Sequence, residues 1–245
     1  MVESYALWIK RQLTHDEFKQ LLSHVSEEKQ RRIRQFYFFS DAQRALLGDL
    51  LARHAVCTRA GVRHDQIRIG LNPYRKPVLV YPENLCFNIS HTEDWVVCAV
   101  DHDPVGIDVE CIKPINLEIA ERFFSTEECM DLLSRNEASL VKHFYRIWTL
   151  KESYIKMIGK GLSIPLHSFT IRIFEDSITL QHDTDENMPS YFRQDDLADS
   201  IVSICAKNKL FGALNLLELE DLILSFSEEK SAEDRPKRFS IGCNP

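Results

Sequence analysis

The chain has 245 residues, of which 44% are hydrophobic and 27% charged, and its formal net charge at pH 7 is −7. This is the composition of a globular protein with a sizeable core, and the negative charge argues against a nucleic-acid binder that works by bulk attraction. No apolar run reaches the ~20 residues needed to span a bilayer, and the first residues lack the order of a signal peptide. The seven cysteines include no CxxC pair, which fits reduced thiols. The sequence predicts a cytoplasmic protein with no nucleic-acid or membrane partner.

The first hundred residues predict short helices and strands around one long helix. The long helix runs from Asp41 to Arg59, where apolar residues recur near the helical period, and Gly61 ends it. The other elements expected here are a strand over 5–9, helices over 16–24 and 27–36, and a turn-rich segment around Pro73 and Pro77.

The second half predicts a hairpin, a third strand, and a long helix that Gly159 and Gly161 terminate. The strands are expected over 85–90, 95–100, 105–110, 169–173, 177–181 and 201–206, and the helices over 117–124, 127–133 and 140–158. From Ser227 onward the chain is charged and lacks periodicity, which predicts a mobile tail over 227–245. The whole set predicts an α+β arrangement.

Asp108 and Glu110 lie two residues apart on the predicted strand over 105–110, so their side chains leave the same face. Ile107 and Val109 then point into the core. Two adjacent carboxylates repel each other unless a cation lies between them, and magnesium prefers oxygen ligands of this kind. For an isolated D-x-E on a strand, a solvated strand edge is the more common explanation.

The predicted helix over 140–158 carries a second acidic group. Trp148, Glu152 and Lys156 are spaced i, i+4 and i+8 and share one flank of the helix. A surface ion pair between Glu152 and Lys156 would be the more common explanation of the pattern if it stood alone. The helix is apolar on most sides, however, and a buried charge requires a partner or a metal. Glu152 would meet that requirement by joining Asp108 and Glu110 at one ion.

Cations and two other polar residues add a third feature. Arg31 and Arg34 fit a solvated basic face, whereas Ser90 and His91, at the end of a strand, offer a hydroxyl and an imidazole to a phosphate. Together with the carboxylates, the cations indicate a polyanionic substrate such as a nucleotide diphosphate. The cations are Lys29, Arg31, Arg32, Arg34, Arg44, Arg75 and Lys76.

Three ordered blocks give the sequence a family resemblance. They are Phe87-Asn88-Ile89-Ser90-His91, Gly106-Ile107-Asp108-Val109-Glu110, and Trp148-Thr149-Leu150-Lys151-Glu152-Ser153-Tyr154-Ile155-Lys156. With their spacing, the Lys76-Pro77 pair and the stretch from Arg44 to Asp49, the chain resembles the Sfp-type 4′-phosphopantetheinyl transferases, which activate surfactin and gramicidin synthetases. The similarity runs from about residue 5 to about residue 220.

The resemblance implies a monomer of two similar α+β lobes related by a pseudo-twofold, with coenzyme A bound in the cleft between them. On this basis we expect an N-terminal lobe over 1–104 and a C-terminal lobe with the metal site over 105–226. The resemblance also implies an activity. The phosphopantetheine arm would pass from coenzyme A to a serine of a peptidyl or acyl carrier protein, with release of adenosine 3′,5′-bisphosphate.

By position, the resemblance implies a role for each residue of the blocks. The implied magnesium ligands are Asp108, Glu110 and Glu152. The implied pocket for the 3′-phosphate of coenzyme A is Lys29, Arg32, Arg44 and His91. The residues expected along the adenine and the phosphates are Tyr74, Arg75, Lys76 and Ser90, with Lys156 on the pyrophosphate.

Two positions depart from the family pattern. Arg75 stands where close relatives often have glycine, so the backbone conformation beside the adenine does not follow from the family pattern. Arg32 stands where lysine is common, and it would hold a phosphate with a planar fork rather than a point charge.

The implied reaction needs a base, because a free serine hydroxyl is a poor nucleophile at neutral pH. We predict Glu152 as the general base, acting directly or through a metal-bound water, and Lys156 as the group that assists the leaving pyrophosphate. The segment Ile112–Ser125 is the candidate surface for the carrier, although its apolar side chains would equally well pack the lobe. Two alternatives remain: a metal-dependent hydrolase of nucleotide diphosphates, and a non-catalytic module that binds coenzyme A or a carrier.

Overall fold

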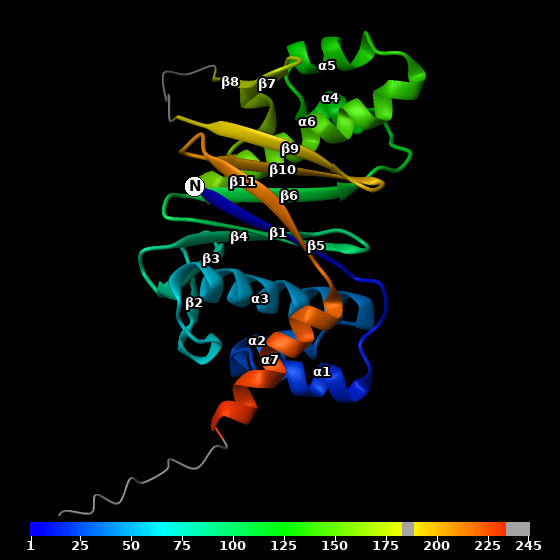
Figure 1. Cartoon of the computed structure of the whole chain (residues 1–245). Helices are drawn as coiled ribbons and strands as arrows, with labels where there is room; N and C mark the ends of the chain where they lie inside the picture. Colours follow the sequence, from blue (N-terminus) through cyan, green and yellow to red (C-terminus); the bar gives the residue numbers. More distant parts are fainter. Residues whose placement is uncertain (183–188, 234–245) are drawn as a thin grey trace, which may run out of the picture.

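The computed structural model describes residues 1–182 and 189–233. It is an α+β structure in which two sheets lie back to back between two long helices (Figure 1). The helices are α1 (His15–Leu22), α2 (Glu27–Ile33), α3 (Phe39–Ala60), α4 (Glu118–Phe123), α5 (Thr126–Leu133), α6 (Glu137–Ile158) and α7 (Leu219–Glu233), with short 3-10 turns at His64–Gln66, Gly161–Ser163 and Leu166–Ser168. The strands are β1 (Val2–Trp8), β2 (Arg68–Leu71), β3 (Pro77–Tyr81), β4 (Cys86–His91), β5 (Trp95–Asp101), β6 (Val105–Cys111), β7 (Phe169–Ile173), β8 (Ile178–His182), β9 (Tyr191–Leu197), β10 (Ser200–Ala206) and β11 (Phe211–Leu217).

The first sheet has the strand order β11-β1-β5-β4, and the second has the order β6-β10-β9. β5 shows why they stack, because it is apolar on both faces. Val96, Cys98 and Val100 join the core under α3, whereas Val97 and Ala99 join the core between the two sheets. The hairpins β2–β3 and β7–β8 stand outside these sheets.

The two long helices cover opposite outer faces of the stack (Figure 1). α3 contacts β4 and β5, and α6 contacts β6 and β10. Each ends at a glycine in the left-handed region, Gly61 with φ 66° and Gly159 with φ 76°. The predicted helices over 41–59 and 140–158, the hairpin and the strand over 105–110 are therefore confirmed.

The C-terminal part of the expected division is wrong. Residues 211–226 were assigned to the C-terminal lobe, but β11 pairs in parallel with β1 in the first sheet. Leu219, Leu222 and Phe226 of α7 are buried in the core under α3, beside residues of the N-terminal half. The C-terminal segment packs on the N-terminal half because β11 pairs with the edge of β1 and α7 covers the apolar face of α3.

The expected tail is also partly wrong, because α7 continues to Glu233 and so includes residues 227–233. The remainder of that prediction, residues 234–245, lies outside the described residues. Within residues 1–182 and 189–233, no helix has the length and apolar character needed to cross a membrane.

Candidate active site

Asp108 lies at the centre of the candidate site, on β6 and facing α6. Its side chain is buried, and its Oδ1 accepts hydrogen bonds from Lys156 Nζ at 2.6 Å and from Ser90 Oγ at 2.9 Å. Its second oxygen, Oδ2, is buried and has no hydrogen-bond partner among the described residues. A buried, unpartnered carboxylate oxygen is costly unless a ligand completes it, so Asp108 is suited to binding a cation.

The contact between β6 and α6 is unusually close at Gly106. A Cβ atom on this residue would lie 2.0 Å from the carbonyl oxygen of Ser153 and 2.4 Å from the backbone nitrogen of Met157. Only a glycine leaves room for the helix backbone at this distance from the strand. This contact brings Asp108, two residues further along β6, against the last turns of α6.

Glu110 and Glu152 are half-buried beside Asp108. Burial, and next the charge of Asp108, raise the pKa of Glu110 to about 7, while the charge of Lys156 and a hydrogen bond from Trp148 oppose the rise. The same two causes raise the pKa of Glu152 to about 6, and the charge of Lys156 opposes them. Burial and the charge of Asp108 therefore disfavour negative charge on both Glu110 and Glu152.

These residues suit a hard divalent cation, although they do not form a preformed cage. Among the described residues, no group of three or more Asp, Glu, His or Cys side chains is arranged to hold a metal. Instead, the ammonium of Lys156 neutralises Asp108. The donors nevertheless fit a hard divalent cation, because they include carboxylates that repel one another and one buried oxygen without a partner among the described residues.

A cleft of about 330 Å³ opens beside these residues and is lined by both halves of the chain. The C-terminal half contributes Glu152 and Lys156 from α6, together with the glycines that follow the helix. The N-terminal half contributes three of the residues predicted to lie along the adenine and phosphates: Tyr74, Arg75 and Lys76. Burial, the largest cause, lowers the pKa of Lys76 to about 8.

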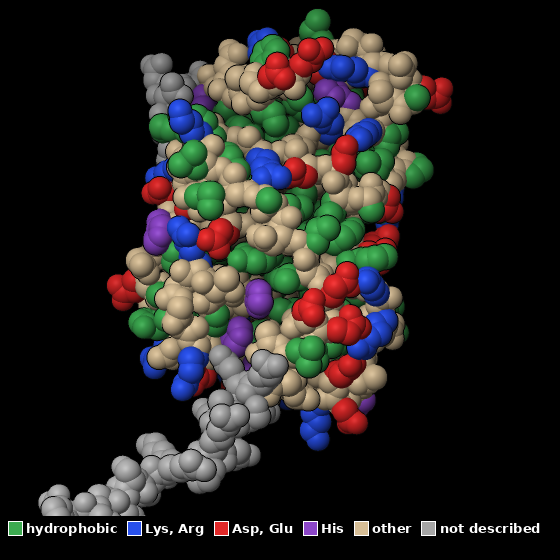
Figure 2. All heavy atoms as spheres, viewed as in Figure 1, with side chains coloured by type: hydrophobic (Ala, Val, Ile, Leu, Met, Phe, Trp, Pro, Cys, Tyr) green, Lys and Arg blue, Asp and Glu red, His purple; other side chains and the backbone are tan. Residues whose placement is uncertain are grey.

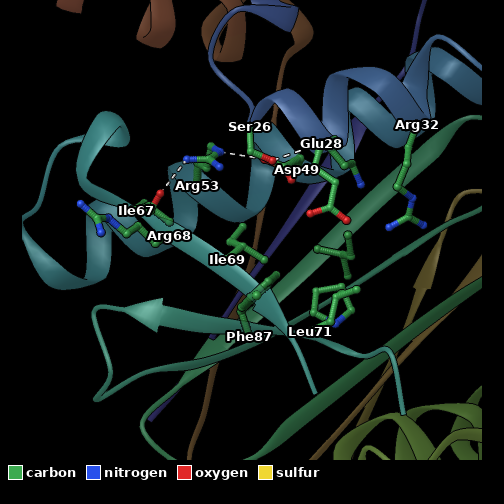
Figure 3. A pocket seen from close by; sticks show the side chains of 14 residues that line it. Ser26, Glu28, Arg32, Asp49, Arg53, Ile67, Arg68, Ile69, Leu71 and Phe87 are labelled. Atoms are coloured by element: carbon green, nitrogen blue, oxygen red, sulfur yellow. Dashed lines mark hydrogen bonds and ion pairs between the residues drawn. The ribbon is translucent and has the colours of Figure 1, made fainter. Parts of the chain in front are cut away.

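The four residues expected to form one 3′-phosphate pocket fall into two pairs. Lys29 and Arg32 line a cavity of about 430 Å³ between α2, α3 and β2, shown in Figure 3. Its back wall holds the Asp49–Arg53 ion pair at 2.7 Å, and its floor is apolar. Burial lowers the pKa of Lys29, while the charge of Asp49 opposes this.

The other pair, Arg44 and His91, is not among the residues that line this cavity. Arg44 pairs with Asp41 at 2.5 Å and donates to the carbonyl oxygen of Glu93. Burial, followed by the charges of Arg44 and Lys156, lowers the pKa of His91. His91 is therefore close enough to Lys156 to be affected by its charge. The cavity of Lys29 and Arg32 adjoins the cleft, because the two share Pro77 and Ile89 in their walls, but Arg44 and His91 are not among the residues that line either space.

In the predicted carrier surface, Ile112–Ser125, most of the apolar side chains are at least partly buried, whereas the charged ones are exposed. Ile115, Leu117 and Phe123 contact the core around Phe124 and Phe144, and Ile119 is the large apolar side chain of this segment that stays exposed. Lys113 pairs with Glu93.

Comparison with known proteins decides the family. A model of the 4′-phosphopantetheinyl transferase superfamily matches residues 104–205, and a model of the N-terminal region of 4′-phosphopantetheinyl transferases matches residues 10–103. Over 221 residues the chain is 37% identical to 4′-phosphopantetheinyl transferase Sfp of Bacillus subtilis, a match that covers 89% of this chain and 99% of Sfp. The chain belongs to the Sfp-type 4′-phosphopantetheinyl transferases.

Two other relatives are also similar to this chain over most of its length. Psf-1 of Bacillus pumilus is 46% identical over 160 residues, which cover 65% of this chain and 69% of psf-1. Gsp of Aneurinibacillus migulanus is 41% identical over 171 residues, which cover 70% of this chain and 71% of gsp. Both are 4′-phosphopantetheinyl transferases.

The hydroxyl of Ser90, which was predicted to lie along the phosphates, donates to Asp108, a contact that the sequence did not indicate. Asn72, which was not singled out, shapes the turn that carries Tyr74, Arg75 and Lys76. An Asn followed by Pro73 is a turn signal that could have indicated it.

Proposed function

We propose that this enzyme transfers the 4′-phosphopantetheine group from coenzyme A to a serine of an apo carrier protein, with Mg²⁺ held by Asp108, Glu110 and Glu152. The observation that carries the proposal is Asp108, whose Oδ2 is buried without a hydrogen-bond partner among the described residues, beside two carboxylates of raised pKa. When bound there, the metal would neutralise negative charge on the phosphates of coenzyme A.

Glu152 has the position and the basicity of a general base. It lines the cleft from α6, and its pKa of about 6 leaves it ionised at neutral pH while making it a stronger base than an exposed carboxylate. It would accept the proton of the carrier serine as the hydroxyl oxygen attacks the β-phosphorus of coenzyme A. The pyrophosphate bond then breaks, and adenosine 3′,5′-bisphosphate leaves.

Lys156 supplies a fixed positive charge at the same place. Its ammonium is held by Asp108 Oδ1 and lies 2.9 Å from Ser90 Oγ, and the residue also lines the cleft. A preorganised ammonium stabilises charge that develops on the leaving phosphate. Lys29 and Arg32, which line the cavity beside the cleft, would hold the 3′-phosphate together with Arg44 and His91.

Incubation with coenzyme A, Mg²⁺ and several apo carrier domains, read by intact mass, tests this function. We expect each accepted carrier to gain the mass of one phosphopantetheine group, and we expect excess EDTA to abolish the gain. No gain on any carrier would contradict the proposal. Turnover of coenzyme A without a carrier would indicate a hydrolase, and tight binding without product would indicate a non-catalytic module.

We further infer a cytoplasmic monomer that does not bind nucleic acid. The net charge of −7 argues against nucleic-acid binding, and the face in Figure 2 shows basic and acidic side chains interspersed over both halves rather than one basic patch. The division into lobes near residue 104 is supported by the two family models, which meet at residues 103 and 104. Size-exclusion chromatography with light scattering tests the monomer, and a dimer mass would contradict it.

A further inference from the structure

The turn between β2 and β3 reaches from the N-terminal half of the chain to the end of α6. Asn72 organises it, because its Oδ1 accepts hydrogen bonds from the backbone nitrogens of Tyr74 at 2.9 Å and Lys76 at 2.8 Å. The backbone nitrogen of Asn72 also donates to the carbonyl oxygen of Lys76 at 2.9 Å. The two ends of the turn are thereby fixed to each other, and both side chains point toward α6.

Both side chains donate to backbone carbonyls of the C-terminal half. Asn72 Nδ2 donates to the carbonyl oxygen of Gly159 at 3.0 Å. Lys76 Nζ donates to the carbonyl oxygens of Lys156 at 2.5 Å and of Val105, at the start of β6, at 3.3 Å. The last carbonyls of a helix have no partner inside the helix, and a cation near them is favourable. The turn therefore supplies hydrogen-bond donors to backbone carbonyl oxygens at the end of α6 and in its cap.

These contacts converge on Lys156. Its carbonyl oxygen accepts from Lys76, while its own ammonium donates to Asp108 Oδ1 at 2.6 Å. The packing is tight here, since a Cβ atom at Gly159 would lie 3.1 Å from Lys76 Cδ. The amino group of Lys76 is thus directed at the protein backbone, where it makes both of the contacts above.

We propose that Asn72 and Lys76 are positioning residues, which clamp the last turn of α6 and so fix the ammonium of Lys156 relative to Asp108. The proposal rests on the proposed function, in which Lys156 acts on the phosphates. It differs from a direct role of the Lys76 side chain on coenzyme A. Without the clamp, the end of α6 would open locally, and a displacement of about 1 Å in a reacting group lowers a rate by about 100-fold.

Steady-state kinetics of Lys76→Met and Asn72→Ala, with coenzyme A varied at saturating carrier, separate the two roles. We expect kcat to fall by about 10- to 100-fold in each variant, while KM for coenzyme A changes by less than about threefold. Because both residues serve one clamp, the double variant should be no more than about threefold slower than Lys76→Met alone. Lys76→Arg should recover part of kcat.

Lys209→Met is the matched control, because Lys209 is exposed in the turn between β10 and β11. We expect it to leave both kinetic constants unchanged. A raised KM for coenzyme A with kcat unchanged in Lys76→Met would make Lys76 a ligand of coenzyme A and overturn the proposal. Unchanged constants in both clamp variants would overturn it as well.

Hydrogen exchange tests the clamp without any carrier or coenzyme A, so it also decides the case in which no carrier is modified. In Lys76→Met and Asn72→Ala we expect the amides of residues 157–160 to exchange about tenfold faster, with the amides of β6 and β10 unaffected. Unchanged exchange at residues 157–160 would refute the clamp. A wild-type enzyme that modifies no carrier, with faster exchange in the variants, would contradict the proposed function alone.

Discussion

The ion pair between Lys151 and Glu128 gives the strongest stability prediction. Both side chains are fully buried, and Lys151 Nζ lies 2.6 Å from Glu128 Oε1 and 2.7 Å from the carbonyl oxygen of Phe169. Lys151→Met keeps the volume but removes the cation, so the buried Glu128 carboxylate keeps the backbone nitrogens of Ser125 and Ile171 as donors without a compensating charge. Breaking a buried pair in this way costs about 3–5 kcal/mol.

Urea denaturation followed by circular dichroism measures this loss. In a domain of this size 3–5 kcal/mol lowers Tm by roughly 6–20 °C. The double variant Lys151→Met with Glu128→Gln should recover part of the loss, because no unpaired charge remains and the amide oxygen still accepts from one of the two backbone nitrogens, while its NH2 group faces the other. Lys142→Met, which removes an exposed pair with Asp196, is the control and should cost less than about 1 kcal/mol. A loss below 1 kcal/mol in Lys151→Met, or no recovery in the double variant, would refute the reasoning.

Three further predictions concern backbone geometry and pH. Arg75 has φ 67°, a backbone conformation that costs a non-glycine residue about 1–2 kcal/mol. Arg75→Gly should therefore stabilise the fold by about 0.5 kcal/mol, once the larger conformational entropy of glycine in the unfolded chain is subtracted. A lowered Tm would contradict this. Gly106→Ala should cost about 1–3 kcal/mol and most of the activity, because its Cβ would meet the backbone of α6, and wild-type kinetics would count against that contact. Because the pKa values of Glu110 and Glu152 are raised to about 7 and about 6, the folded state binds more protons than the unfolded state between about pH 4.5 and 7. In EDTA, unfolding free energy should therefore fall by about 1–3 kcal/mol from pH 5 to pH 7.5, after allowance for partial exposure, and Mg²⁺ should restore it at pH 7.5. The fall should be smaller in Glu110→Gln, where Glu152 still titrates, and a flat wild-type profile would contradict this cause.

Local pattern predicted the strand that carries the two carboxylates correctly. Ile107 and Val109 are fully buried between the sheets, and Asp108 faces α6 as the strand alternation requires. The degree of burial on α6 was not predictable in the same way. The fully buried charge of this helix is Lys151, whereas Glu152 is half-buried. Helical period gives the angle between neighbours, but the protein around the helix decides which face is enclosed.

Elements that depend on distant pairing were missed. β11 is a strand because it pairs with β1, a contact between the two ends of the chain that no local pattern reports. α7 did carry a signal, since Leu219, Leu222 and Phe226 follow the helical period and all three are buried. The left-handed backbone conformation of Arg75 could not be predicted from the sequence, because it depends on hydrogen bonds that Asn72 makes across the turn.

The most direct test of the three-carboxylate site compares Glu152→Gln with the wild type in two measurements on the same preparation. Intact mass gives the rate of phosphopantetheine transfer to a carrier, and isothermal titration calorimetry gives the affinity for coenzyme A in the presence of Mg²⁺. We predict that turnover falls by about 10²- to 10⁴-fold, the usual contribution of a general base, while Kd for coenzyme A changes by less than about tenfold. An equal loss of turnover and affinity would reduce Glu152 to a ligand of the metal, and unchanged turnover would contradict its place in the site.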